Sequence, residues 1–222
     1  MNLYFDLDGT ILDSRTAAVL ATQQTFEELF GVHIDDLDVI DKMGTPIEVS
    51  FGQFGGGIAT HDRLPEALQT FRAIYAELAP LHVTCFPGIP QALQCLRSRG
   101  AKFAVVTSKK TAVAVRELGQ LGLDGFFETV IGSDRALAYK PNPAPLLLAQ
   151  GELGRCAVEY MIGDADVDIM MGLAVGMPTI GVTWGSHEGN RLIEAGASAV
   201  FDSVEKLEKF LLLRFDDDTL TN

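Results

Sequence analysis

The stretch Asp6-Leu7-Asp8-Gly9-Thr10 decides the fold of this chain. It follows a short apolar run that begins at Asn2 and is typical of a buried strand. Carboxylates at the end of a buried strand are costly to desolvate unless something pairs with them. In open α/β sheets, ligands bind at the carboxyl ends of the strands. The stretch therefore predicts either a ligand site at the edge of a sheet or a solvated surface turn.

Asp6 and Asp8 can point the same way, because alternate residues of an extended chain share a face. Two like charges this close raise one pKa or attract a cation. Hard oxygen ligands of this kind suit Mg²⁺. Gly9 permits a sharp turn after the acids, and Thr10 can brace that turn. The pair indicates a magnesium site, although an ordinary Asp-Gly turn explains the same residues.

Composition narrows the classes of function. The chain has 222 residues, enough for one large domain or for a core with an inserted unit. Its net charge of −13 disfavours nucleic acid and anionic membranes as partners. No apolar run reaches the length of a membrane span, and the N-terminus lacks a signal-peptide pattern. The three cysteines have no CxxC spacing, which is typical of reduced thiols and leads us to expect a cytoplasmic protein.

Two kinds of pattern divide the chain. Residues 14–84 have no strand pattern, and their apolar residues recur at helical spacing. From residue 85 onward, strand and helix patterns alternate, which predicts a parallel sheet covered on both faces. The expected strands are residues 103–106, 129–131, 160–162, 179–182 and 199–201. We therefore expect a doubly wound, Rossmann-like α/β core of residues 1–13 and 85–222, with an all-helical domain of residues 14–84 inserted.

Two further segments place polar groups at strand ends. The strand at residues 103–106 runs into Thr107-Ser108-Lys109, where hydroxyl and backbone amide groups can form an anion cradle. A plain helix N-cap is the alternative interpretation of those residues. Lys140-Pro141 follows the next strand, and the fixed backbone of Pro141 can aim Lys140 inward. A solvated loop lysine is the usual alternative.

The strand at residues 160–162 runs into a second pair of acids. Asp164 follows Gly163 at the strand end, and Asp168 lies four residues on, one helical turn away, where it can face the same site. Acids are also common at helix N-termini without any ligand. Taken together, these segments place acids, a hydroxyl group and a lysine at successive strand ends of one sheet.

This order and spacing of motifs resembles the haloacid dehalogenase-like hydrolase superfamily, and the chain looks like its phosphoglycolate phosphatase-like branch. The motifs that carry the resemblance are Asp6-Leu7-Asp8-Gly9-Thr10, Thr107, Lys140-Pro141 and Gly163-Asp164 with Asp168. The resemblance covers nearly the whole chain, and residues 14–84 stand where that branch carries a helical cap domain. It implies a Mg²⁺-dependent phosphatase that hydrolyses a small phosphorylated metabolite such as phosphoglycolate, as a monomer or a homodimer.

The resemblance also implies a role for each motif residue. Asp6 would be the nucleophile that forms an aspartyl-phosphate, and Asp8 would be the general acid and base. Mg²⁺ would be held by the Asp6 carboxylate, the backbone carbonyl of Asp8 and Asp164, with Asp168 holding a metal-bound water or orienting Lys140. Phosphoryl oxygens would be bound by Thr107, the cradle at Ser108, and Lys140.

Other readings stay open. Within the superfamily, the chain could be a pyrophosphatase, a nucleotide phosphatase or a sugar-phosphate mutase, although Ile47 stands where a mutase usually offers an arginine. A carbon–halogen hydrolase would lack the second acid, Asp8. A phosphoacceptor receiver domain would lack both the helical insert and the late pair of acids, and a non-catalytic interaction protein would not explain the acids. Lys42 and Thr45 are candidate substrate contacts, although ordinary packing within the cap or solvation explains them better.

Overall fold

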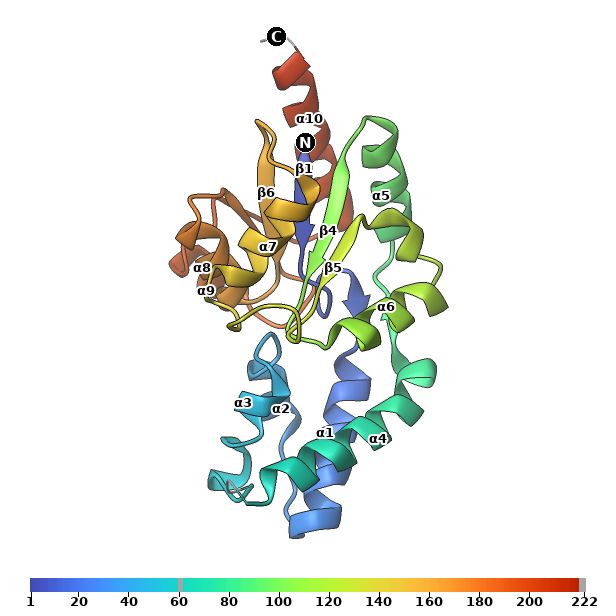
Figure 1. The fold of residues 1–222 in the computed structure, drawn as a ribbon, viewed down its shortest axis with the longest axis vertical. Helices are drawn as coiled ribbons and strands as arrows, with labels where there is room; N and C mark the ends of the chain where they lie inside the picture. The colour runs from blue at the N-terminus through green and yellow to red at the C-terminus, as the bar shows by residue number, and fades with distance from the viewer. Residues whose placement is uncertain (60–61, 220–222) are drawn as a thin grey trace.

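The computed structural model describes residues 1–59 and 62–219 (Figure 1). Its centre is a parallel sheet of six strands in the order β5-β4-β1-β6-β7-β8. The strands are β1 (Asn2–Phe5), β4 (Lys102–Val106), β5 (Thr129–Ile131), β6 (Glu159–Gly163), β7 (Thr179–Val182) and β8 (Ala199–Phe201). The predicted α/β fold class and each predicted strand are thus confirmed.

Helices cover both faces of this sheet, because alternate residues of each strand are buried on opposite sides. In β1, Tyr4 packs in the same apolar cluster as residues of α7 and α8, whereas Leu3 and Phe5 pack in the cluster that contains residues of α5, α6 and α10. The helices of the core are α5 (Ile89–Ser98), α6 (Thr111–Gln120), α7 (Ala144–Leu153), α8 (Asp166–Ala174), α9 (Gly189–Glu194) and α10 (Val204–Thr219), with a short 3-10 turn η2 (Asp124–Phe126).

The described residues between 14 and 84, here called the helical segment, lie together at one end of the molecule (Figure 1). The segment contains α1 (Arg15–Phe30), α2 (Asp36–Asp41), α3 (Ile47–Ser50), η1 (Phe54–Gly56) and α4 (Leu64–His82). The long helices α1 and α4 pack side by side. Aromatic rings hold the shorter elements against them, since the ring of Phe26 lies 5.3 Å from that of Phe51 and 5.8 Å from that of Phe54.

The chain crosses between core and helical segment at two adjacent places. β2 (Leu12–Asp13) and β3 (Thr84–Cys85) form a short antiparallel pair there. These two short strands were not predicted, because two residues give no periodic pattern. Within the described ranges, no helix combines the length and apolarity needed to cross a lipid bilayer.

Candidate active site

Three strands of the sheet end directly before predicted site residues. β1 ends at Phe5 before Asp6, β4 ends at Val106 before Thr107, and β6 ends with Gly163 before Asp164. Because the strands are parallel and adjacent in the order β4-β1-β6, these residues emerge at the same edge of the sheet. The fold therefore gathers motifs that lie far apart in the sequence.

Asp6, Asp164 and Asp168 form a buried acid cluster at this edge. One carboxylate oxygen of each lies within 4.8 Å of those of the other two. The Nζ atom of Lys140 donates hydrogen bonds to Oδ1 of Asp6 at 2.6 Å and to Oδ1 of Asp168 at 2.7 Å. The peptide bond between Lys140 and Pro141 is cis. Lys140 is buried, so the expectation that it points inward is confirmed by its position.

Asp164 is held from two sides of the site. The hydroxyl of Thr10 donates to its Oδ1 at 3.1 Å, and the backbone N–H of Ser186 donates to its Oδ2 at 2.7 Å. A Cβ at Gly9 would fall 2.1 Å from that Oδ2, and one at Gly185 would fall 2.3 Å from it. Only glycine therefore lets both backbones approach the carboxylate, and Gly9 also adopts a positive φ of 82°.

The acid cluster carries more negative charge than its lysine can neutralise. Burial raises the pKa of Asp6 to about 7, although the Lys140 ammonium opposes this shift. Burial and the nearby Asp6 charge raise the pKa of Asp164 to about 7 as well. Three buried carboxylates facing one ammonium leave an uncompensated charge of the kind that a divalent cation with oxygen ligands neutralises. The donor set thus fits the Mg²⁺ expected from the sequence.

Asp8 lies outside this cluster and belongs to a second network. Its Oδ1 accepts hydrogen bonds from the Lys109 ammonium at 2.7 Å and from the Ser14 hydroxyl. The same ammonium donates to Oε2 of Glu117 at 2.6 Å and to the Tyr75 hydroxyl at 3.0 Å. The two acids of the opening motif therefore have different surroundings.

The loop of residues 107–110 runs between β4 and α6. Thr107 is buried, and its Oγ1 accepts a hydrogen bond from the backbone N–H of Lys109 at 3.1 Å. The Ser108 hydroxyl donates to the backbone carbonyl of Gly44 at 2.6 Å, so its side chain contacts the helical segment. Phosphate binding by Thr107 and Ser108 stays a prediction. Because the Ser108 hydroxyl is bound to Gly44, the group of Ser108 that is predicted to bind phosphate is its backbone amide.

A cavity of about 330 Å³ lies between the core and the helical segment. Asp6, Asp8 and Thr107 line it from the core, and Lys42 and Thr45 line it from the helical segment. The structure thus brings both candidate substrate contacts to the space that adjoins the two acids.

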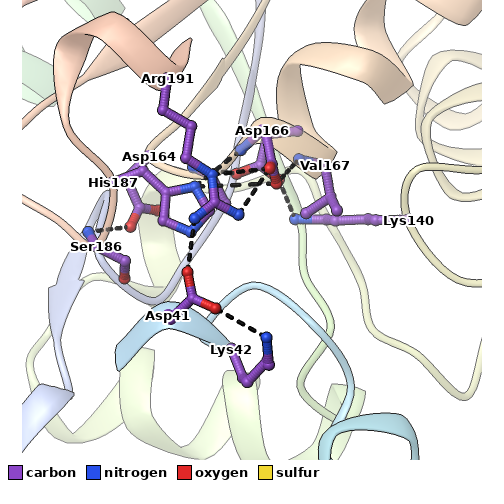
Figure 2. A network of polar contacts seen from close by, with 11 residues as sticks. Asp41, Lys42, Lys140, Asp164, Asp166, Val167, Ser186, His187 and Arg191 are labelled. Atoms are coloured by element: carbon purple, nitrogen blue, oxygen red, sulfur yellow. Dashed lines mark hydrogen bonds and ion pairs between the residues drawn. The ribbon is translucent and has the colours of Figure 1, made fainter. Parts of the chain in front are cut away.

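A polar network fastens the helical segment to the core beside the acid cluster (Figure 2). Arg191 donates from Nη1 to Oδ1 of Asp41 at 2.7 Å and from Nη2 to Oδ2 of Asp166 at 2.8 Å. The backbone N–H of Asp166 donates to Nδ1 of His187 at 3.2 Å. Asp41 also accepts from the Lys42 ammonium at 2.8 Å, so the charge of Lys42 is already paired.

Sequence reasoning identified the acid cluster but missed the residues that surround it. Lys109 is part of the predicted cradle segment, yet nothing in its local pattern indicates that its ammonium binds Asp8 and Glu117. Ser14 occupies the N-cap position of α1, but its side chain binds Asp8 and makes no capping hydrogen bond. Arg191 is 150 residues from its partner Asp41, so only the folded chain reveals that pair.

Comparison with known proteins agrees with this geometry. A sequence model described as "Haloacid dehalogenase-like hydrolase" matches residues 3–182. A protein of Dickeya dadantii named "Probable phosphatase IndB" is 33% identical over 206 residues, which are 91% of this chain and 90% of that protein. A phosphoglycolate phosphatase of Colwellia psychrerythraea is 30% identical, and the match covers 92% of this chain and 94% of the relative.

Two further comparisons add a relative that is named for a different substrate and a solved structure with the same fold. A protein of Halalkalibacterium halodurans named pyrophosphatase PpaX is 31% identical, with 79% of this chain and 80% of the relative covered. The solved structure of a haloacid dehalogenase-like family hydrolase from Streptococcus pneumoniae superposes with a TM-score of 0.82 at 26% identity, covering 94% of this chain and 97% of that one.

The chain belongs to the haloacid dehalogenase-like hydrolases. Within that family, the similar proteins described above include several that are named phosphatases.

Proposed function

We propose that this protein is a Mg²⁺-dependent phosphatase that hydrolyses a small phosphomonoester through an aspartyl-phosphate on Asp6. The observation that carries the proposal is the buried acid cluster around Lys140, which adjoins a cavity at the strand ends. Such a site offers a fixed carboxylate as nucleophile and an excess of oxygen ligands for a cation. Membership of the hydrolase family supports the same reaction type.

In the first half of the proposed reaction, a carboxylate oxygen of Asp6 attacks phosphorus and the bond from phosphorus to the alcohol oxygen breaks. Asp8 gives its proton to that leaving oxygen. The hydrogen bond from Lys140 to Oδ1 of Asp6 fixes the orientation of the nucleophile. Thr107 and the neighbouring backbone amides hold the phosphoryl oxygens.

In the second half, a water molecule gives a proton to Asp8 and attacks phosphorus. The bond between phosphorus and the Asp6 oxygen breaks, which restores the carboxylate and releases phosphate. Asp6, Asp164 and the backbone carbonyl of Asp8 would hold Mg²⁺. Asp168 would hold a metal-bound water or orient Lys140, whose ammonium it binds. When bound, the ion supplies positive charge against the phosphoryl oxygens in an otherwise acidic protein.

The proposal also assigns separate roles to the core and to the helical segment. Residues 1–13 and 85–222 form the catalytic core, and residues 14–84 form a cap that closes over the cavity and contacts the leaving group. The contact between Ser108 and Gly44 and the pair between Arg191 and Asp41 support this assignment, because both join the two parts beside the site.

Phosphoglycolate is the first substrate to test, since it is the substrate named for the Colwellia relative. Pyrophosphate is the second, because it is named for the Halalkalibacterium relative.

The experiment is a phosphate-release assay over a panel of phosphomonoesters and pyrophosphate, with Mg²⁺ or with EDTA. We expect release only with Mg²⁺, its loss in Asp6→Asn, and its retention in Asp13→Asn, a carboxylate that does not line the cavity. Full activity in Asp6→Asn or in EDTA contradicts the mechanism. A phosphorylated protein that persists with little turnover favours the receiver interpretation instead.

A further inference from the structure

We propose that the alcohol released by this enzyme is apolar, such as an arylmethyl or alkyl alcohol. This inference rests on the proposed phosphatase function and adds to it the chemical class of the leaving group. It follows from the wall of the cavity that the helical segment provides, and from how the charges near that wall are paired.

The cavity extends from Asp6 and Asp8 to the helical segment, and its part beside the helical segment is here called the chamber. Beyond Asp6 and Asp8, the helical segment lines the cavity with the apolar side chains of Ala18, Val39, Ile47, Phe51, Phe54 and Phe71, together with polar side chains such as those of Thr22, Ser50 and Glu48. The cavity volume of about 330 Å³ lies at the lower end of the range of roughly 300–1,000 Å³ found for small-molecule pockets. The chamber therefore has room for a leaving group larger than glycolate.

The aromatic part of this wall is preformed. The ring centroids of Phe51 and Phe71 are 5.1 Å apart at 81°, and those of Phe51 and Phe54 are 5.9 Å apart at 66°. All three side chains are buried, so their packing fixes their orientation. A fixed apolar wall binds an apolar group without first having to become ordered.

The cations that the helical segment brings to the cavity already have partners. Lys42 pairs with Asp41 at 2.8 Å, and Arg72 pairs with Glu48 at 2.5 Å. Neither therefore offers a free positive charge to the carboxylate of phosphoglycolate or to a second phosphate group.

The cations from the core side are either paired or open to water. The Lys109 ammonium is bound by Asp8 and Glu117. Lys110 and Arg116 line the cavity but are exposed, where solvent screens their charge. An acidic leaving group in the chamber would thus lose its hydration without gaining a buried counter-charge, whereas an apolar group gains from leaving water.

The test compares phosphomonoesters of primary alcohols, so that their intrinsic reactivities are similar: benzyl phosphate, hexyl phosphate, glycerol phosphate and phosphoglycolate. With Mg²⁺ present, we expect kcat/KM for benzyl and hexyl phosphate to exceed that for phosphoglycolate by about tenfold or more. Hydrolysis of phosphoglycolate at an equal or higher kcat/KM overturns the inference while leaving the phosphatase function intact.

A matched pair of variants on α4 locates the effect. Ala76 lines the cavity and Ala73 does not, and both are exposed, so a larger side chain fits at either position without disturbing the core. Ala76→Phe should lower the ratio of kcat/KM for benzyl phosphate to that for glycerol phosphate by about tenfold, and Ala73→Phe should leave this ratio unchanged. Equal ratios in both variants contradict the proposed chamber.

Binding of non-hydrolysable analogues separates this inference from the catalytic proposal. Calorimetry with Mg²⁺ should show phenethylphosphonate binding about tenfold or more tightly than phosphonopropionate, with a negative heat-capacity change. If phosphonopropionate binds more tightly and Arg116→Met removes that advantage, the exposed cations set specificity and the inference is wrong. If phenethylphosphonate binds more tightly but no ester is hydrolysed, the chamber is supported and the phosphatase function fails.

Discussion

The ammonium of Lys109 lies 2.7 Å from Oδ1 of Asp8, whereas the ammonium of Lys140 lies 2.6 Å from Oδ1 of Asp6. Glu117, only 1% exposed, and the Tyr75 hydroxyl hold the Lys109 ammonium in place. Asp6 and Asp8 are thus separated by one residue in the sequence but have different lysine partners. This arrangement keeps the proposed general acid apart from the proposed nucleophile.

Lys109→Met tests whether this lysine positions Asp8. Because a positioned general acid contributes about 10²–10⁴-fold to rate, we expect kcat for an alkyl phosphate to fall by at least about tenfold. The loss should be smaller with nitrophenyl phosphate, whose leaving group needs no proton. Steady-state kinetics of both substrates gives the comparison.

Removing Lys109 also leaves the buried Glu117 without its cation, so the fold needs a separate check. Lys109→Met combined with Glu117→Gln removes that unpaired charge, and thermal unfolding reports on both variants. Lys110→Met, next in sequence but exposed, is the matched control. An equal loss with both substrates would show that Lys109 does not act through proton donation by Asp8.

Asp41→Asn tests the ion pair that fastens the helical segment to the core. Asp41 is exposed, and an exposed pair contributes about 0.2–1 kcal/mol, so we expect KM to rise by no more than about fivefold and the melting temperature to fall by no more than about 4 °C. Higher ionic strength should reduce the difference from the unmodified protein. Asp38→Asn on the same helix is the control, and an equal rise in KM there would contradict a role for the pair between Asp41 and Arg191.

The acid cluster predicts that Mg²⁺ stabilises the protein more at high pH. Asp6 and Asp164 have folded pKa values of about 7, against 3.8 for the ordinary group, so the metal-free folded state binds more protons than the unfolded state between these values. These groups therefore make the metal-free protein less stable as the pH rises from about 4 to about 7. Mg²⁺ requires the deprotonated carboxylates and relieves their repulsion.

Thermal unfolding with and without Mg²⁺ at about pH 5 and about pH 8 checks this prediction. The rise in melting temperature should be larger at the higher pH and should disappear in Asp164→Asn. A rise that is the same at both pH values, or that survives in Asp164→Asn, would show that the ion binds elsewhere.

The strand ends were predictable because their signals are local. The run before Asp6 and the runs before Thr107 and Asp164 are apolar, and a polar residue follows each at once. A parallel sheet then brings these ends to one edge, whatever the details of packing. The sequence therefore predicts that Asp6, Asp164 and Asp168 lie together, and in the structure their carboxylates form one cluster.

The second network could not be predicted in the same way. Lys109 meets Tyr75 and Glu117 only because α4 and α6 approach each other across the boundary between helical segment and core. The apolar wall of the cavity likewise uses residues whose spacing indicates only helix packing. Side-chain pairing across tertiary contacts sets these features, and one sequence gives no signal for it.

The most direct test of the central claim is detection of the phosphoryl group on Asp6. In Asp8→Asn, nitrophenyl phosphate can still transfer its phosphoryl group, because its leaving group needs no proton, while hydrolysis of the intermediate slows. Mass spectrometry of acid-quenched Asp8→Asn protein should find one phosphoryl group on the peptide that contains Asp6, and none when Asp6→Asn is added. A phosphoryl group on another residue, or none while phosphate is still released, would contradict the account.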